Sequence, residues 1–415
     1  MTVTDTNTPN RTAEEADAEH TRTADEAIDA LLSEHDPTEL SRMEFRGHQY
    51  DAGLAWVHHP RGFGGLGLPR RISRHVEQRL RAAGAQAADP ATFFLSLIGP
   101  TVVTHGSDEQ KGRYLRPMFT GEEVWCQLFS EPGSGSDFAG LGTRAERDGD
   151  EWVVNGQKVW NTLAHVADLG MLVARTNPEL PKHKGLTYFA LDMRAPGVEV
   201  RPLRQITGEA EFNEVYMTDV RVPDTARIGA VGEGWRVSLT TLMNERTAIG
   251  GAAGGASAAK QSPLASLVET YRNMDPAVRT KAHRDEVMQL WIRGLALWYT
   301  NARATQNSRA GNPGPEGSVS KLMLAEFNQD LTAKVLDLEG AAAMVDYDYQ
   351  FRRPTAVSID GKHGDTHHGF LRARANSIEG GTSEIMRNIL GEQVLGLPGE
   401  PRVDKEIPWR DVPRN

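Results

Sequence analysis

The segment from Trp125 to Asp168 constrains this chain more than any other part. It joins a Gly/Ser-rich loop, GlySerGlySerAsp at 133–137, to a β-rich stretch that ends in TrpAsnThr at 160–162. Small residues let backbone N–H groups approach phosphate oxygens, and an aromatic face covers a ring while polar groups reach the ring edge. The segment therefore predicts a site for a phosphorylated planar cofactor.

Residue patterning on either side of this segment divides the chain into five regions. Residues 1–36 hold ten Asp/Glu and two Arg without aromatics, which is typical of a disordered acidic segment. Helix-type spacing follows from Asp25 and from Val76, and returns after Trp235. We expect an α+β fold with a disordered acidic tail at 1–22, a helical domain at 23–123, an antiparallel β domain at 124–234, a helical bundle at 235–400 and a tail at 401–415.

The β domain contains one strong turn signal. GluTrpValValAsnGlyGlnLysValTrp, from Glu151, alternates apolar and polar residues around Asn155–Gly156. Asn-Gly is the most favourable pair for a two-residue hairpin. The sequence therefore predicts a hairpin that turns at Asn155–Gly156.

Composition excludes several classes of protein. Hydrophobic and charged contents of 39% and 25% suit a globular protein, and no apolar run approaches the roughly 20 residues of a membrane span. There is no apolar signal segment at the N-terminus, and the single cysteine, Cys126, suits a reducing cytoplasm. No basic stripe is present to follow nucleic acid. We expect a cytoplasmic protein.

Three other motifs are weaker. GlyPheGlyGlyLeuGly at 62–67 matches a dinucleotide-binding pattern, but HisHisProArg precedes it where a strand is required, so it predicts a structural turn. The cluster His363, Asp365, His367 and His368 has no second group of ligands, so we expect no metal site. Cys126 has no base assigned by spacing, so packing is the favoured role.

The helix that begins near Trp235 carries the candidate base. At 100° per residue Trp235, Leu239, Leu242, Arg246 and Ile249 form one stripe, with Glu245 at its margin. A carboxylate beside an apolar stripe indicates either a salt-bridged helix end or a general base whose pKa is raised by desolvation. The small residues that follow, from Gly250, leave space for a ligand and favour the base.

From about residue 40 to 400 the chain resembles the acyl-CoA dehydrogenase family. The resemblance lies in TrpCysGlnLeuPheSerGluProGlySerGlySerAsp (125–137), LysValTrpAsnThr (158–162), AsnGluArgThrAlaIleGlyGly (244–251) and GlyGlyThrSerGluIleMetArg (380–387). It implies FAD held between a β domain and C-terminal helices, and an acyl-CoA from which a Glu removes the α-proton while hydride leaves the β-carbon for flavin N5. Electrons would pass to an electron-transfer flavoprotein, in fatty acid or steroid side-chain catabolism.

The resemblance also implies residue roles. Glu245 would be the base and Arg246 would lie with it at the substrate. Gly380 would polarise the thioester through its N–H, and Ser136 would contact the CoA portion. The residues implied at FAD are Gln127, Leu128, Phe129, Ser130, Trp160, Asn161, Thr162, Thr382 and Glu384.

Two departures from the family pattern bear on this reading. Many members place the base just before Gly-Thr, but that position is Gly380 here, so Glu245 is assigned and the adjacent Glu379 is the second choice. The family's Arg-x-x-Phe-Gly contact to a neighbouring subunit's flavin is missing, and its Gln-x-x-Gly-Gly contact is reduced to AspLeuGluGlyAla at 337–341. We expect a homo- or hetero-oligomer. The alternatives are an oxygen-using flavin oxidase or monooxygenase, and a flavin-poor subunit of a hetero-oligomeric dehydrogenase.

Overall fold

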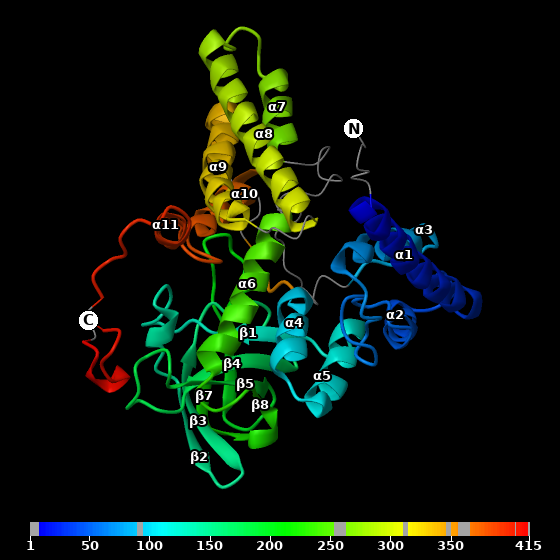
Figure 1. The fold of residues 1–415 in the computed structure, drawn as a ribbon. Helices are drawn as coiled ribbons and strands as arrows, with labels where there is room; N and C mark the ends of the chain where they lie inside the picture. The colour runs from blue at the N-terminus through cyan, green and yellow to red at the C-terminus, as the bar shows by residue number, and fades with distance from the viewer. Residues whose placement is uncertain are drawn as a thin grey trace, which may run out of the picture. The chain divides into compact units, whose positions relative to one another are not determined.

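The structure is a computed structural model that describes residues 8–88, 94–252, 263–309, 314–345, 350–355, 366–402 and 404–413 (Figure 1). For residues 8–14, 246–252, 263 and 308–309 it describes the backbone alone. Packing divides the chain into two compact units. The first is Met1–Cys126 with Ala167–Gly170, and the second is Gln127–Val166 with Met171–Asn415.

The first unit is helical. Its helices are α1 (Thr8–Glu34), α2 (Arg42–Asp51), α3 (Ser73–Ala82), α4 (Leu95–His105) and α5 (Asp108–Thr120). Capping boxes begin α2 at Ser41 and α5 at Ser107, so local sequence sets both starts. The residues of one buried core come from α1, α2, α3 and the segment between α2 and α3: Ala24, Ile28, Leu31, Phe45, Leu54, Val57, Leu68, Ile72, Val76 and Leu80.

Helix α1 differs from the disordered tail expected at 1–22, because the helix already begins at Thr8. Its carboxylates face cations of α3 and of the turn just before it. Asp17 accepts from Arg71 Nε at 2.5 Å, and Asp25 accepts from Arg79 at 2.5 Å. The acidic composition suggested uncompensated charge, whereas the folded unit pairs that charge with a helix about fifty residues away.

The Gly-rich segment at 62–67 folds into a turn that closes on its own backbone. The N–H of Trp56 donates to Gly64 O at 2.9 Å. A Cβ at Gly65 would lie 2.1 Å from His59 O, so only glycine allows this close approach. The segment is the structural turn that its sequence context predicted.

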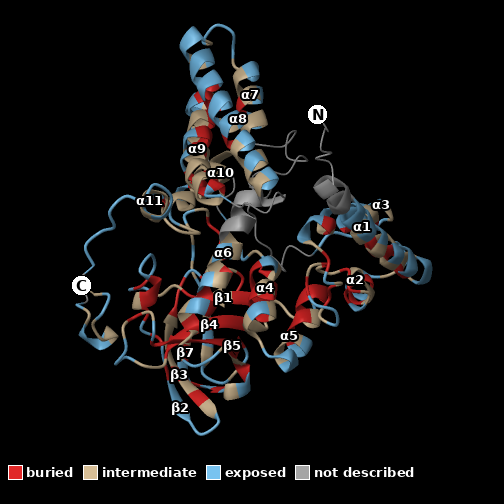
Figure 2. Ribbon diagram, in the orientation of Figure 1, coloured by how far each residue is buried: buried red, intermediate tan, exposed pale blue. Residues whose placement is uncertain are grey.

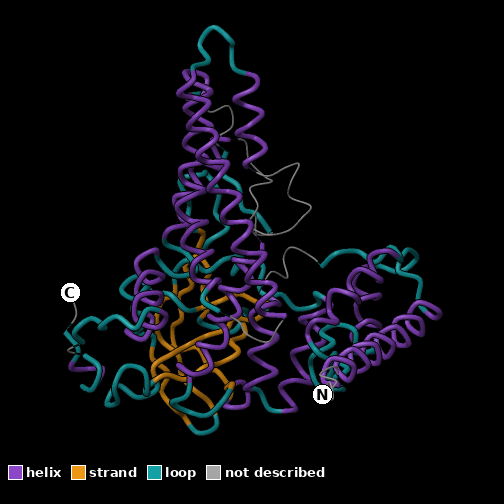
Figure 3. Tube along the Cα trace, turned by 45° about the horizontal axis from the view of Figure 1, so that its top comes forward, coloured by secondary structure: helices purple, strands orange, loops and turns teal. Residues whose placement is uncertain are grey.

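Most residues of an eight-stranded sheet belong to the second unit. Its strands are β1 (Trp125–Leu128), β2 (Arg144–Asp148), β3 (Glu151–Lys158), β4 (Leu169–Arg175), β5 (Leu186–Asp192), β6 (Val198–Pro202), β7 (Asn213–Pro223) and β8 (Arg227–Ile228). The order is β6-β7-β3-β2-β4-β5-β8, and β1 pairs with β4. The pairs β2–β3, β3–β7, β6–β7 and β5–β8 are antiparallel. Figure 3 shows the strands gathered together, and Figure 2 shows β4 and β5 buried along most of their length.

The prediction of a hairpin turn at Asn155–Gly156 was wrong. Asp148 pairs with Glu151, so the chain turns at Gly149, whose φ of +67° glycine adopts readily. Gly156 lies inside β3, beside a register shift against β7. A Cβ there would meet Thr143 Oγ1 at 2.4 Å. The glycine permits a close approach within the sheet, which the local Asn-Gly signal did not reveal.

Helices form the rest of the second unit. They are α6 (Gly234–Ala252), α7 (Pro263–Asn273), α8 (Lys281–Arg309), α9 (Glu316–Glu339), α10 (Thr366–Ala373) and α11 (Ser383–Ile389). Helix α6 packs on β5, and α8 and α9 run side by side (Figure 1). The order of helical, β and helical regions confirms the expected architecture. Within the described helices, none has the length and apolar character that crossing a membrane requires.

Candidate functional site

Strand β1 and the residues after it form the first half of the candidate cofactor site. Gln127 and Ser130 are half-buried, whereas Leu128 and Phe129 are buried. Lys158 holds the backbone of this half in place, because its fully buried Nζ donates to Phe129 O at 3.0 Å. Lys158, the first residue of the LysValTrpAsnThr motif, therefore holds the backbone at the end of the first motif.

Lys158 is balanced by Glu131, which lies at the start of the Gly/Ser-rich loop. Their Nζ and Oε1 atoms are 2.8 Å apart. Glu131 also accepts from the N–H groups of Gly142 at 2.6 Å and Thr143 at 2.9 Å. Burial would raise the pKa of Glu131, but the Lys158 ammonium and the bonds from Thr143 and Gly142 hold that pKa below its ordinary value. One carboxylate therefore closes the loop, Glu131–Gly142, which we call the anion loop.

The second half of the candidate cofactor site is the turn at 160–162. Trp160 has φ +62°, a sparsely populated conformation for a bulky residue, and its ring is 57% exposed. The buried Asn161 donates through Nδ2 to Gln127 O at 2.8 Å, and Val159 N donates to Ser130 O at 2.9 Å. The fold therefore brings the two halves of the signature together.

This turn also leaves a buried acceptor unsatisfied. Asn161 Oδ1 has no hydrogen-bond partner among the described residues. The other polar groups of Asn161 are hydrogen-bonded: its Nδ2 donates to Gln127 O, and its carbonyl accepts from Asn213 Nδ2. Thr162, beside it, is half-buried. An exposed indole and a buried acceptor without a donor fit a planar ring that carries N–H groups. The residues present therefore suit a flavin.

Ser136 lies on the exposed part of the anion loop. Below it, Ser134 is buried and its hydroxyl donates to Asp137 O at 2.6 Å. Asp137 in turn pairs with Lys182 at 2.8 Å. Ser136 is thus presented to solvent on a loop whose backbone is bonded internally.

Helix α6 packs on the sheet through small side chains rather than through its larger apolar ones. Val237, Ser238 and Thr241 are fully buried, and Thr241 Oγ1 lies 3.3 Å from the Tyr188 hydroxyl of β5. Leu239 of the apolar stripe is 38% exposed, and Met243 is 64% exposed. Small residues suit close packing on a strand, so the larger apolar side chains of α6 are left available to a ligand.

Glu245 is half-buried on α6, one turn beyond Thr241. Arg246 follows it on the same helix, and the Arg246 side chain and Ile249 lie outside the described side chains. The buried ammonium of Lys321 interacts electrostatically with Glu245. Glu245 thus lies at a charged site within the helical part of the second unit.

Lys321 of α9 is a buried cation beside the late motif that the sequence did not reveal. It is 2% exposed, and its Nζ donates to Asn376 O at 2.9 Å and to Gly381 O. Burial lowers its pKa, while the carboxylates of Glu379, Glu245 and Glu384 oppose that shift. The only available signal was a lysine among apolar residues in SerValSerLysLeuMetLeu at 318–324.

The late motif begins with two successive glycines held by Lys321. Gly380 has φ +62° and Gly381 has φ +96°, and a Cβ on Gly381 would meet Met386 Cε at 2.7 Å. Thr382 caps α11 by accepting from Ile385 N at 3.1 Å, so its hydroxyl serves the helix start. Glu384 is exposed in the first turn of α11.

Glu379, the second choice for the base, is bound within an ionic network. Arg372 donates to both of its carboxylate oxygens, at 3.1 and 3.0 Å, and Asn376 Nδ2 donates to it at 2.7 Å. Arg372 also lies 3.4 Å from the buried Glu211. Bidentate binding stabilises the ionised carboxylate and occupies its lone pairs, which disfavours Glu379 as a proton acceptor.

The structure describes Cys126 and part of the histidine cluster. Burial raises the pKa of the Cys126 thiol far above its ordinary value, which argues against a nucleophile. His368 pairs with Glu209 at 2.8 Å and His367 lies 2.8 Å from Ala343 O. His363 and Asp365 lie outside the described residues. In the part of the chain that the structure describes, no three His, Cys, Asp or Glu side chains are grouped to hold a metal ion.

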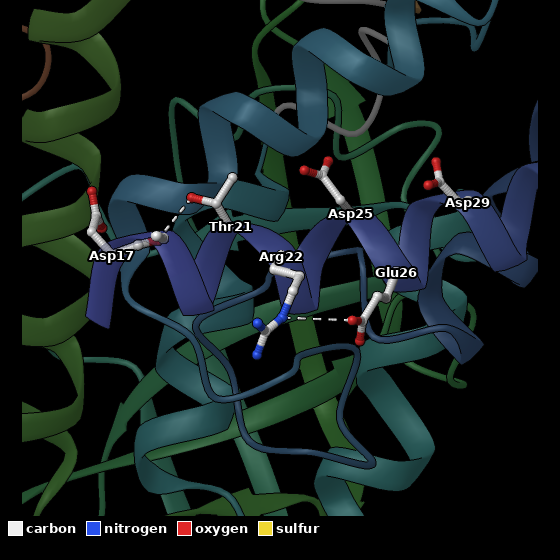
Figure 4. A pocket seen from close by; sticks show the side chains of 7 residues that line it. Asp17, Thr21, Arg22, Asp25, Glu26 and Asp29 are labelled. Carbon is white, nitrogen blue, oxygen red and sulfur yellow. Dashed lines mark hydrogen bonds and ion pairs between the residues drawn. The ribbon is translucent and has the colours of Figure 1, made fainter. Parts of the chain in front are cut away.

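One surface hollow lies along α1 (Figure 4). Its lining residues all come from that helix: Asp17, Ala18, Thr21, Arg22, Asp25, Glu26 and Asp29. Arg22 and Glu26 form an exposed i,i+4 pair at 3.7 Å. A single solvated helix face offers no convergent groups, so the hollow supports no catalytic role.

Comparison with known proteins identifies the family of this chain. The family descriptions "Acyl-CoA dehydrogenase, N-terminal domain", "middle domain" and "C-terminal domain" match residues 11–122, 126–220 and 232–395. Acyl-CoA dehydrogenase IpdE1 of Mycobacterium tuberculosis is 37% identical over 358 residues, which are 85% of this chain and 86% of that protein. The ChsE4–ChsE5 complex of Mycobacterium tuberculosis is similar in structure, with a TM-score of 0.65 and 25% identity over 96% of this chain and 100% of that chain.

A further relative is longer. Acyl-CoA dehydrogenase FadE34 of Mycobacterium tuberculosis is 37% identical over 349 residues, which are 84% of this chain but 45% of that protein. The chain thus spans about half the length of this relative and most of the length of IpdE1. All three domain matches lie in the expected order along the chain. The chain belongs to the acyl-CoA dehydrogenase family, whose members are oxidoreductases acting on CH–CH bonds.

Proposed function

We propose that this protein catalyses FAD-dependent α,β-dehydrogenation of an acyl-CoA thioester, with Glu245 as the base. The observation that carries the proposal is the union of the two signature halves, through Asn161 Nδ2 and Gln127 O at 2.8 Å. The exposed Trp160 ring and the unsatisfied Asn161 Oδ1 support a planar occupant there. Family membership supports FAD as that occupant.

FAD, when bound, supplies the hydride acceptor at N5. The chain would hold it through Gln127–Ser130 and Trp160–Thr162, with Thr382 and Glu384 contributing from the start of α11. Lys158 and Glu131 keep the first of these segments in place. Hydrogen bonds within the protein position both segments, so little ordering would be left for binding to supply.

Glu245 would remove the α-proton of the acyl group, and Gly380 would donate its N–H to the thioester oxygen. Polarising that oxygen acidifies the α-carbon, so the two groups act on one step. The turn that holds Gly380 is bonded to Lys321, which also faces Glu245. The network around Glu379 supports Glu245 over Glu379 as the base.

The CoA part of the substrate would bind near Ser136 and Arg246, and its acyl group would lie along α6. Trp235, Leu239 and Met243 are apolar side chains of α6 that remain partly or largely exposed. Such a surface suits a bulky apolar acyl group, as in fatty acid or steroid side-chain catabolism.

We infer that the working protein is an oligomer that transfers electrons to an electron-transfer flavoprotein. Exposed apolar side chains follow one face of α8: Met288, Trp291, Ile292, Leu295, Trp298 and Tyr299. A stripe of this size supports an interface. The reduced partner-side motif at 337–341 and the relative described as a ChsE4–ChsE5 complex support a second, different subunit.

Anaerobic titration tests the proposed reaction. The purified protein is expected to show flavin absorbance that bleaches when acyl-CoAs are added. Glu245→Gln should slow bleaching by at least about 100-fold, the scale of a lost general base, while Glu379→Gln serves as the matched control. Unimpaired bleaching in Glu245→Gln would remove Glu245 from the base role.

The same preparation separates the alternatives. Oxygen-dependent reoxidation that yields an oxygenated product would replace the dehydrogenase with an oxidase or monooxygenase. A colourless protein that gains FAD only when mixed with another chain would replace it with a partner subunit.

A further inference from the structure

The last segment of the chain is bound to the anion loop instead of forming a free tail. Residues 404–413 follow the end of the family match at residue 395. Pro408 forms a β-bridge with Pro181, and Trp409 N donates to Leu180 O at 2.9 Å. Arg410 NH1 pairs with Glu179 at 2.6 Å. We call the segment Asp404–Val412 the C-terminal strap.

Two side chains of the strap reach the anion loop. Trp409 Nε1 donates to Gly140 O at 3.0 Å. Asp404 accepts from Lys182 Nζ at 2.5 Å, and the same Nζ donates to Asp137 at 2.8 Å. Lys182 is largely buried and therefore bridges strap and loop as one ionic link.

Arg175 of β4 completes the attachment. Its guanidinium stacks over the Trp409 ring, with 4.3 Å to the ring centroid. The same group donates to Ala139 O at 2.6 Å and to Leu141 O at 3.1 Å. Three successive carbonyls of the loop are therefore bound: Arg175 binds those of Ala139 and Leu141, and Trp409 binds that of Gly140. The Trp409 ring also covers the Arg175 guanidinium.

We propose that the C-terminal strap holds the anion loop in the conformation that binds the CoA part of the substrate. Glu131 closes the loop at its base, whereas the strap fixes its second half, directly after Ser136. Without the strap, the loop would have to be ordered when substrate binds, and that cost appears as weaker binding. The role in CoA binding rests on the proposed function, whereas the attachment rests on the geometry alone.

Substitutions at both contacts test the proposal in the full-length protein. Trp409→Ala and Asp404→Asn remove the two contacts, and Trp409→Phe keeps an aromatic face under Arg175. Asp148→Asn is the matched control, because Asp148 is an exposed carboxylate paired with Arg221 at 3.0 Å, away from the loop. Calorimetric titration with free coenzyme A gives affinity, and hydrogen–deuterium exchange gives the protection of residues 131–142.

The expected result is affinity for coenzyme A at least about tenfold weaker in Trp409→Ala and Asp404→Asn, with faster exchange at 131–142. FAD content and melting temperature should stay near wild type, and Trp409→Phe should fall between. KM for acyl-CoA should rise while kcat changes little. Unchanged exchange in Trp409→Ala would overturn the strap, and faster exchange with unchanged affinity would overturn its role in CoA binding.

Failure of the proposed function looks different. In that case the wild-type protein would neither bind coenzyme A nor bleach with acyl-CoAs, whereas exchange at 131–142 would still respond to Trp409→Ala. A parallel loss of FAD, coenzyme A affinity and melting temperature would mean general unfolding and would overturn the proposal.

Discussion

Single buried charges organise this site, and Lys321 is the clearest case. Its Nζ donates to Asn376 O and Gly381 O, and the carboxylates of Glu379, Glu245 and Glu384 interact with it electrostatically. The sequence identified the glycines of the late motif but not the cation that holds them. Composition and periodicity place a lysine on a helix and do not show which backbone carbonyls it meets.

Replacing Lys321 tests this role. Lys321→Met keeps the apolar stem but leaves two part-buried carbonyls without this donor, which costs up to about 1–3 kcal/mol each. We expect a lower melting temperature and slower flavin bleaching in the same variant. Thermal unfolding and anaerobic stopped-flow measure the two. Wild-type rates at unchanged stability would show that the turn does not depend on Lys321.

Asp224 gives a pH-dependent prediction. The Arg227 guanidinium, and then the Trp152 indole, hold the pKa of Asp224 well below its ordinary value against the opposing effect of burial. Because the pKa of Asp224 is lower in the folded state than in the unfolded state, where it is about 4, the ionised carboxylate stabilises the fold at pH values above about 4. That stability is lost as the pH falls from about 4 through the folded-state pKa.

Asp224→Asn should therefore lower the free energy of unfolding by about 1–2 kcal/mol at pH 7. The difference from wild type should shrink as pH falls below about 4. Urea unfolding at pH 7 and pH 3.5 measures both values. A difference that grows at low pH would contradict the assignment of the effect to the ionised carboxylate.

At the scale of elements, the sequence predicted types of structure better than their contacts. The helical, β and helical regions follow from periodicity, and the α1, α3 and α5 patterns are local. The predictions of a turn at Asn155–Gly156 and of a disordered segment at 1–22 were wrong. In both cases a distant partner decided the outcome: Thr143 against Gly156, and Arg71 against Asp17.

Helix α8 supports a prediction about assembly. Trp298 is 49% exposed within the apolar stripe, so Trp298→Glu would place a charge inside the inferred interface. We expect a smaller assembly by light scattering. Gln289→Glu, on the same helix but off the stripe, is the control. If the assembly of Trp298→Glu has the same mass as wild type, the stripe is not the subunit interface.

For the molecule as a whole, folding and cofactor binding should be linked. The segments proposed to hold FAD lie within the second compact unit, so FAD should stabilise that unit. At 100 times its Kd, a ligand that binds only the folded state adds about 2.7 kcal/mol.

We therefore expect added FAD to raise the melting temperature of cofactor-free protein, and Trp160→Ala to reduce that rise. Trp160 is exposed, so its loss should leave the cofactor-free melting temperature nearly unchanged. Met43→Ala, which removes another exposed apolar side chain, is the control. An equal rise in Trp160→Ala would exclude its ring from the cofactor site.

The pair Lys158–Glu131 restricts how this protein can evolve. Lys158 is fully buried and Glu131 nearly so, and removing one member of such a pair leaves an uncompensated charge at a cost of about 3–5 kcal/mol. That loss is a large share of the 5–15 kcal/mol by which domains are stable. Substitution at either position should therefore be tolerated only together with a compensating change at the other. The two positions should show strong epistasis, which couples the evolution of the proposed cofactor segment to that of the anion loop.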